Sequence, residues 1–132
     1  MEAEKTGQSK GMYWTGWVLS ILPAGMMIAG AVYGLMNPGK MAEQFKQFHY
    51  PDGAVIPLIY VELACAILYL IPQTAVLGAI LLTGYLGGAT NHHVHAGESI
   101  LFVPVLIGVV IWLGLYLREP RLRSLVPLRS RR

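Results

Sequence analysis

Glu62 is the residue whose type and position point most directly to chemistry, because it is the one charged residue in the apolar segment 54–71. A carboxyl group inside an apolar helix is costly, and it is by default a functional candidate that faces other helices. Helical spacing places Cys65, Ala66 and Tyr69 below it on the same face. The pattern predicts an acid held inside a helical bundle. The alternative is a purely structural hydrogen bond between helices.

Histidine is the second candidate type, and three of the four histidines form a cluster at His92, His93 and His95. If this segment is helical, Asn91 and His95 share a face while His93 points nearly the opposite way. We expect acid–base or hydrogen-bonding roles, since imidazole changes its charge near neutral pH. Two alternatives stay open: a metal or haem site formed by the cluster together with His49, and an interfacial loop without chemistry.

The spacing of the two candidates predicts a separation between them and leaves open whether their side chains meet directly. A hairpin after segment 54–71 sets Glu62 level with Thr83 and Gly84, and His93 then lies roughly 13 Å higher at about 1.5 Å per residue. A ligand or an ordered water would bridge that separation. The predicted catalytic residues are Glu62 and His93, and the predicted substrate-binding residues are Tyr33, Tyr60, Tyr85, Asn91, His92 and His95. They describe an apolar cavity with a few polar groups, the general form of a small-molecule site.

The composition indicates that these side chains are positioned by a membrane scaffold. Hydrophobic residues make up 55% of the 132 residues and charged residues 13%, whereas soluble domains carry about 25% charged residues. This excludes an ordinary soluble enzyme, because a chain of this length cannot cover so much apolar surface. The single cysteine, Cys65, excludes a disulfide framework.

Four apolar stretches approach the length of roughly 17–25 residues that a membrane-crossing helix needs; they are 13–36, 54–71, 74–91 and 101–117. We predict an all-α, four-helix membrane bundle that forms one domain over residues 1–132. A polar segment at 1–12 precedes the bundle and a basic tail at 118–132 follows it. Because only Pro72 and Gln73 separate the second and third stretches, we expect a tight antiparallel hairpin there.

Lysine and arginine predict the orientation of this bundle. If both termini are cytoplasmic, the outer side carries only Lys40 and Lys46, and the other eight of the ten positive residues lie inside. Positive residues favour the cytoplasmic side of a membrane, so both termini are predicted to be cytoplasmic. The arginines of the tail would also contact anionic lipids. Their position gives no support for nucleic-acid binding.

Two patterns of glycines one helical turn apart lie in the predicted spans, at Gly30 and Gly34 and at Gly84 and Gly88. Such spacing lets helix backbones approach closely. We expect these glycines to pack helices together within the bundle. The alternative is that they form the face of a homodimer.

With these segments in place, the chain resembles the DoxX-like family of small four-helix bacterial membrane proteins. The likeness runs from Trp14 to Leu128, and it rests on VEL at 61–63 with YLIP at 69–72, LGAIL at 77–81 with GGATNHH at 87–93, and LYLREPR at 115–121. The resemblance implies a multi-pass protein of the bacterial cytoplasmic (inner) membrane.

The resemblance also assigns two candidate residues. Glu62 matches the intramembrane acid of the family, and His93 matches the histidine that closes its Gly-Gly-Ala segment. The family commonly has threonine in place of His92 and arginine in place of His95. The histidine cluster is therefore a departure from the family pattern.

The family takes its name from a quinone-linked sulfur oxidation system, and some relatives are associated with membrane redox complexes. We expect this chain to bind a quinone- or isoprenoid-like molecule in the outer half of the bundle, with Glu62 and His93 as acid–base or hydrogen-bonding groups. If it is an enzyme, it is an acid–base or quinone-linked membrane enzyme acting on a lipophilic substrate. The alternatives are a non-enzymatic subunit that docks a redox or transport partner, and the metal or haem protein described above.

Overall fold

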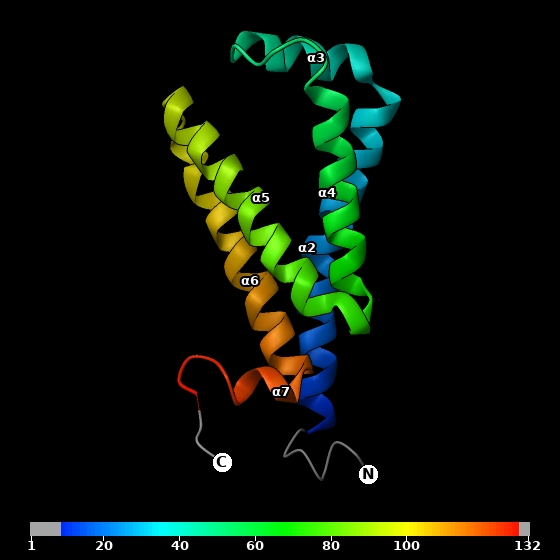
Figure 1. Ribbon diagram of the computed structural model, residues 1–132, viewed down its shortest axis with the longest axis vertical. Helices are drawn as coiled ribbons and strands as arrows, with labels where there is room; N and C mark the ends of the chain where they lie inside the picture. Colours follow the sequence, from blue (N-terminus) through cyan, green and yellow to red (C-terminus); the bar gives the residue numbers. More distant parts are fainter. Residues whose placement is uncertain (1–8, 130–132) are drawn as a thin grey trace.

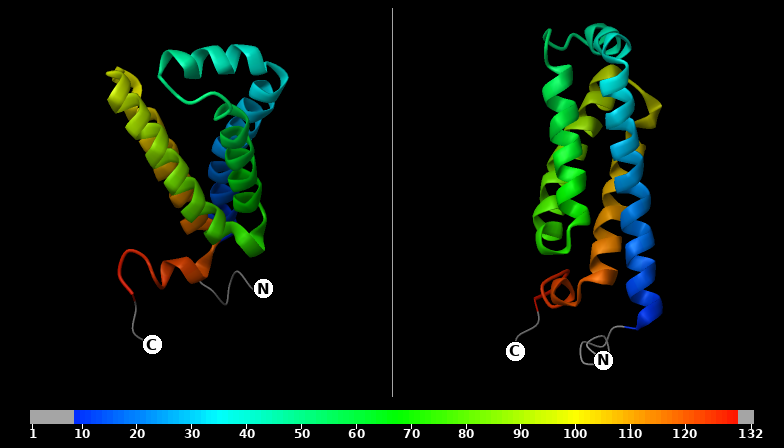
Figure 2. Two further views of the ribbon diagram at one scale, coloured as in Figure 1. Left: turned by 45° about the horizontal axis from the view of Figure 1, so that its top comes forward. Right: turned by 90° about the vertical axis from the view of Figure 1, so that its right-hand side faces the viewer.

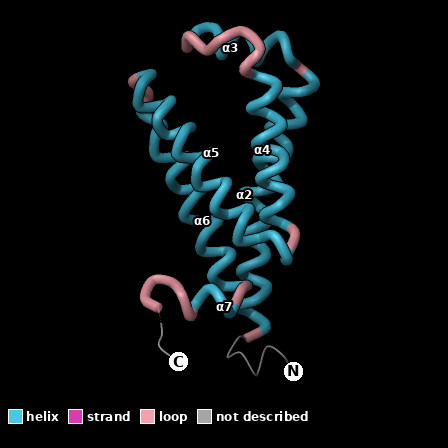
Figure 3. The backbone as a smooth tube through the Cα atoms, viewed as in Figure 1, coloured by secondary structure: helices cyan, strands magenta, loops and turns pink. Residues whose placement is uncertain are grey.

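The computed structural model describes residues 9–129, which form helices joined by short turns (Figures 1 and 3). This part of the chain contains no strand. Its four long helices are α2 (Lys10–Met36), α4 (Val55–Leu70), α5 (Ala75–Ala96) and α6 (Phe102–Arg118). They pack in the cyclic order α2, α4, α5, α6, so that each helix contacts two others. The all-α fold predicted from the sequence is confirmed.

The four helices coincide with the four predicted spans, but they differ in their fitness to cross a membrane. Of the described helices, only α2, with 27 residues, is by itself long and apolar enough. Helices α4 and α5 add a second candidate if the bent pair counts as one broken span, and α6 is a shorter apolar helix of 17 residues. Four membrane crossings and cytoplasmic termini stay predictions.

A helix that we did not predict follows α2. The side chain of Asn37 donates a hydrogen bond to the carbonyl of Tyr33 (3.0 Å) where α2 ends, and α3 (Pro38–Gln47) begins at the next residue. Helix α3 lies across one end of the bundle, above α2 and α4 in Figure 1. Its Met41 and Phe45 pack against a small core cluster formed by α2 and α4. The helix therefore covers the apolar ends of its two neighbours.

The connection between α4 and α5 corrects the expected tight hairpin. The chain changes direction by 108° there, through the short 3-10 turn η1 (Pro72–Thr74), and the Thr74 hydroxyl donates to the carbonyl of Leu68 (2.8 Å). At Gly78 the two backbones nearly touch, because a Cβ at this position would lie 2.3 Å from the Tyr69 nitrogen. The helices cross at this point and separate toward their other ends (Figures 1 and 2).

Tyr69 joins three of the helices where they approach most closely. Its side chain is fully buried, at 0% exposed. The hydroxyl donates to the carbonyl of Ile111 on α6 (2.7 Å) and lies 2.9 Å from the Ser20 hydroxyl oxygen on α2. Ser20 in turn donates to the carbonyl of Gly16 (2.7 Å). These buried polar groups therefore satisfy one another, which is the condition for their burial to be tolerated.

Arg118, the first residue of the predicted basic tail, is buried against the bundle. It is the last residue of α6 and only 7% exposed. Its Nη2 donates to the carbonyl of Tyr69 (2.7 Å), and its guanidinium stacks on the rings of Trp17 and Tyr69. The physical reason is that carbonyl groups at the end of α4 have no partner within the helix and need a donor.

The predicted tail therefore begins with a buried residue and continues as the short helix α7 (Pro120–Arg123). Part of the predicted terminal segments, at residues 1–8 and 130–132, lies outside the described residues.

The glycine patterns are also corrected. A Cβ at Gly30, Gly84 or Gly88 would meet nothing within 4 Å, so these glycines do not pack helices together within the chain. Of the four, only Gly34 lies close to another helix, at Ile59. The close approaches occur instead where a Cβ would meet backbone atoms of a neighbouring helix, at Gly16, Gly78 and Gly114.

The glycine contacts predict opposite outcomes for the same substitution on α5. We expect Gly78→Ala to destabilise the protein by about 1–3 kcal/mol, because the added methyl group would overlap the backbone of α4. Gly84→Ala, in open space, should be neutral or stabilise the helix by up to about 1 kcal/mol. Denaturant unfolding in detergent, followed by circular dichroism, measures both. Equal stability of the two variants would contradict the close crossing.

Candidate functional site

A cavity of about 290 Å³ lies between the four long helices on the side of the crossing where α4 and α5 separate. Its lining is mostly apolar, and three polar side chains face it: Glu62, Tyr85 and His93. The full lining is Met26, Met27, Glu62, Tyr85, Leu86, Ala89, His93, Val103, Pro104 and Ile107. Both predicted catalytic residues, Glu62 and His93, and one predicted substrate-binding residue, Tyr85, therefore line one cavity.

Glu62 lies on α4, half-buried, and accepts a hydrogen bond from the Tyr85 hydroxyl at its Oε2 (3.1 Å). The predicted interior stripe of α4 is confirmed, since Cys65, Ala66 and Tyr69 are buried. The partner of Glu62 comes from α5, close to the level expected from the sequence. The carboxyl group therefore has one neutral donor beside it in a mostly apolar setting.

His93 is paired with Glu98, a residue that the sequence reasoning missed. Its Nδ1 lies 2.5 Å from the Oε2 of Glu98, so Nε2 is the ring nitrogen left for a ligand. The pairing results from the end of α5, where Gly97 adopts a left-handed conformation (φ 71°). The Glu98 amide donates to the carbonyl of His93 (3.0 Å) and the Gly97 amide to that of Val94 (3.1 Å), the two bonds of a Schellman motif.

The sequence signal for this turn was Gly97 itself. Glycine after a run of helical residues is typical of a helix end, and the turn brings the next residue back toward the last helical turn. That signal predicts a helix through Ala96, where we had ended the third span at 91, and it predicts the contact between Glu98 and His93.

Tyr85, Ala89 and His93 follow one another at intervals of four residues on α5, so they share a face. Tyr85 and His93 are therefore about 12 Å apart along the helix axis. Ala89 lies between them and its small side chain leaves space in the cavity. Glu62 and His93 thus line one cavity through separate partners, Tyr85 and Glu98, with room for a ligand between the two pairs.

The other predicted binding residues lie outside this cavity. His92 packs edge-on against Phe48, with ring centroids 4.5 Å apart, and against Tyr50 at 5.4 Å. The remaining four are exposed and do not line the cavity: Tyr33, Tyr60, Asn91 and His95. The structure therefore separates the predicted site residues into a cavity group and a surface group.

The histidine cluster does not converge on one point. Helix α5 continues through it, and although the rings of His92 and His93 are in contact (centroids 5.4 Å apart), His92 packs against Phe48 and His93 pairs with Glu98. Within residues 9–129, no group of three or more histidine, cysteine, aspartate or glutamate side chains is arranged so that it could hold a metal ion. His49 is exposed in the turn before α4. The arrangement of side chains within residues 9–129 thus gives no support to a metal site with three protein ligands.

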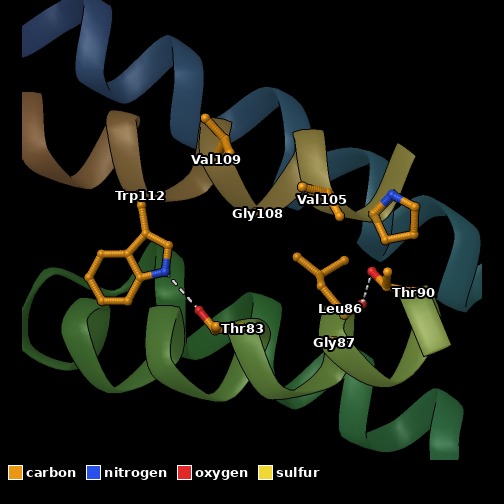
Figure 4. A pocket seen from close by; sticks show the side chains of 9 residues that line it. Thr83, Leu86, Gly87, Thr90, Val105, Gly108, Val109 and Trp112 are labelled. Atoms are coloured by element: carbon orange, nitrogen blue, oxygen red, sulfur yellow. Dashed lines mark hydrogen bonds between the residues drawn. The ribbon is translucent and has the colours of Figure 1, made fainter. Parts of the chain in front are cut away.

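A groove of about 440 Å³ runs between α5 and α6 and shares Leu86 and Pro104 with the cavity (Figure 4). Trp112 points across it toward Thr83, and the indole N–H donates to the Thr83 hydroxyl (2.7 Å). The hydroxyls of Thr83 and Thr90 each donate to a carbonyl of their own helix. With these polar groups satisfied, the groove offers a ligand a largely apolar surface.

The contact between His93 and Glu98 predicts the position of the imidazole proton. In the neutral ring Nδ1 should carry the proton, because Glu98 accepts from it. Nitrogen-15 NMR of the ring should show this tautomer in the wild type and in Glu98→Gln, which keeps an acceptor oxygen. Glu98→Ala should shift the population toward the Nε2–H tautomer. Unchanged ring signals in Glu98→Ala would contradict the pairing.

Comparison with known families gives a match. The sequence profile of the DoxX-like family matches residues 18–114, a range that contains the crossing at Tyr69, both cavity pairs and most of α6. Comparisons with curated proteins and with solved structures gave no match. The family is membrane-associated, in agreement with the apolar composition. The chain belongs to the DoxX-like family.

Proposed function

We propose that this protein crosses the bacterial inner membrane several times and binds a lipophilic small molecule in the cavity between its four long helices. Glu62 and His93 act there as acid–base or hydrogen-bonding groups. The observation that carries the proposal is that one mostly apolar cavity contains two separate polar pairs, Glu62 with Tyr85 and His93 with Glu98. Apolar pockets with a few well-placed polar groups are the usual form of small-molecule sites.

The two pairs define the chemistry of a ligand that fits between them. Each would hold one polar end of a molecule whose middle contacts apolar side chains, among them Leu86 and Ile107. Quinone- and isoprenoid-like molecules have this combination of oxygen atoms and hydrocarbon. The family resemblance favours the same class.

Both pairs are suited to proton exchange with such a ligand. The carboxyl group of Glu62 keeps Oε1 for the ligand, because the phenol of Tyr85 binds Oε2. Nε2 of His93 accepts a proton from a ligand hydroxyl group, and Glu98 orients the ring by binding Nδ1. A histidine oriented by a carboxylate is a common general base. If the protein is an enzyme, its reaction is therefore proton transfer at an oxygen atom of a lipophilic substrate.

The groove between α5 and α6 supports entry of the ligand from the lipid phase. It is open, largely apolar and separated from the cavity by two shared residues, Leu86 and Pro104. Hydrocarbon from the bilayer enters such a groove without the loss of hydrogen bonds, since its threonines and Trp112 already have partners.

The surfaces of the helices support several membrane crossings. Large apolar side chains are exposed along all four long helices; Leu22 on α2 is 65% exposed and Leu106 on α6 is 61% exposed. Contiguous apolar surface of this kind would be costly in water, and it marks contact with lipid or with another protein. We therefore retain the four-span arrangement with both termini in the cytoplasm as our proposal.

A non-enzymatic subunit that docks a redox or transport partner is the second candidate. The observation that favours it is the open face of α5 at Gly84 and Gly88, where a Cβ would meet nothing within the chain. A partner helix, or the same face of a second copy, fits there without the cavity taking part. Glycine faces of this kind commonly mediate helix association in membranes.

A measurement of retained lipid tests the cavity. Protein purified in mild detergent should retain a lipophilic molecule from the membrane, detectable by mass spectrometry of an organic extract. Glu62→Gln should reduce retention about tenfold or more, because a hydrogen bond to an ionisable group contributes about 1.5–3 kcal/mol. Ala89→Leu should do the same by filling the cavity.

Matched controls separate the cavity from general effects of the substitutions. Glu43→Gln and Ala64→Leu make the same changes at exposed positions of α3 and α4, and both should retain the molecule. Full retention by Glu62→Gln would contradict the proposed site. The subunit would be favoured instead if the wild type recovers a partner protein, Gly84→Leu loses that partner, and Ala89→Leu has no effect.

Labelling of single cysteines tests the orientation of the protein in the membrane. In a Cys65→Ala background, Lys46→Cys should react with a membrane-impermeant maleimide in intact cells, because α3 is placed outside. Arg121→Cys should react only after the membrane is permeabilised. Labelling of both positions in intact cells would contradict the three crossings, α4, α5 and α6, that we propose between them.

A further inference from the structure

We call the turn from α6 into α7, together with the segment up to residue 129, the C-terminal elbow. Its positive charges form no ion pair with acidic side chains of residues 9–129. Its described residues include four arginines, Arg118, Arg121, Arg123 and Arg129, and one acid, Glu119. The Glu119 side chain accepts a hydrogen bond from the backbone N–H of Arg121 (3.1 Å). Across residues 9–129 the one ion pair within 4 Å joins His93 to Glu98 at the opposite end of the bundle.

Two of these arginines also have buried nitrogen atoms that lack a hydrogen-bond partner in the described part of the chain, Nε of Arg118 and Nη2 of Arg123. Buried charged donors without partners are costly. A negative group from outside residues 9–129 would therefore complete this region. Arg118 is too deeply buried to bind that group directly, so its charge adds to the field that Arg121 and Arg123 present.

An apolar groove of about 330 Å³ lies at the same elbow. It is lined by the last turns of α6, by α7 and by the segment after it: Trp112, Leu113, Tyr116, Leu122, Val126 and Pro127. Beyond it Leu125 and Leu128 are exposed. Leu122 lies between Arg121 and Arg123 in α7, so the groove and the positive charges occupy the same short helix.

We propose that the C-terminal elbow is a binding site for one anionic phospholipid. Arg121, which is exposed, binds its phosphate group, Arg123 adds positive charge beside it while its Nη1 contacts the sulfur of Met12, and one acyl chain lies in the groove beside Leu122. Arginine suits this role because its planar guanidinium forms two parallel hydrogen bonds to a phosphate. Trp112 and Tyr116 fit the same placement, since their rings favour the level of lipid headgroups.

The charge balance selects an anionic lipid over a zwitterionic one. A phosphatidylcholine headgroup would bring a quaternary ammonium beside four arginines, and Glu119 already binds a backbone N–H. A phosphatidylglycerol headgroup brings only the negative phosphate. This site is independent of the Glu62 cavity, so it can fail or hold whatever the outcome for the proposed function.

The test is native mass spectrometry of the full chain, purified in mild detergent and mixed with equal amounts of palmitoyl-oleoyl phosphatidylglycerol and phosphatidylcholine. The wild type should retain one phosphatidylglycerol molecule in preference to phosphatidylcholine. The pair Arg121→Gln and Arg123→Gln should lower that retention roughly tenfold or more, since each basic residue near a lipid surface contributes about 1 kcal/mol. The pair Lys40→Gln and Lys46→Gln removes the same charge from α3 and should leave retention unchanged.

Three results would overturn the proposal. The first is equal retention of the two lipids by the wild type. The second is an equal loss of phosphatidylglycerol in the arginine and lysine pairs, which would indicate net charge alone. The third is displacement of the lipid by millimolar inorganic phosphate, or equal binding of dihexanoyl phosphatidylglycerol, because either would leave the groove without a role. Since Arg123 is partly buried, Arg121→Gln alone repeats the measurement at an exposed position, with a loss of several-fold expected.

Discussion

The arrangement of the bundle depends on the burial of one tyrosine at the crossing of its helices. The hydroxyl of Tyr69 contacts α2 and α6 through Ser20 and Ile111, while the backbone of Tyr69 lies against Gly78 of α5. An orphaned buried polar group costs about 1–3 kcal/mol, so the helices must stay at the positions where these partners are within reach. Arg118 adds a further condition, because it satisfies the Tyr69 carbonyl at the end of α4. These contacts therefore fix the position of each long helix along its neighbours.

The open end of the bundle is a consequence of the close contact between the helices at the crossing. With backbones in contact at Gly78 and a turn of 108° before it, α4 and α5 move apart along their length. A tight antiparallel hairpin would pack them side by side and fill the space around Glu62. The end that opens is crossed by α3, and the ring of His92 on α5 packs against Phe48 in the turn after α3. The cavity therefore has walls from four helices and aromatic contacts near its end.

The sequence predicted the features that depend on local pattern. The apolar stretches located the four long helices, and the isolated charge with its helical spacing located Glu62 on the interior face of α4. It did not predict Arg118, because a rule that assigns arginine to the cytoplasmic side does not say which arginine meets a buried carbonyl. Two glycines one turn apart permit close packing, but the place where helices cross decides which glycines are used, and Gly84 is not among them. Glu98 could have been found from Gly97.

The distribution of charge explains why Glu62 can serve a ligand. Arg118 donates a hydrogen bond to the carbonyl of Tyr69 at the crossing. The other described arginines of the C-terminal half lie beyond it, in the C-terminal elbow. An arginine beside Glu62 would form a bidentate pair and occupy both carboxyl oxygen atoms. Tyr85 donates a single hydrogen bond to Oε2, and this leaves Oε1 for the ligand that we propose. Because the described arginines lie at the tight end, the open end keeps an acid whose strongest available partner would be the ligand that we propose for the cavity.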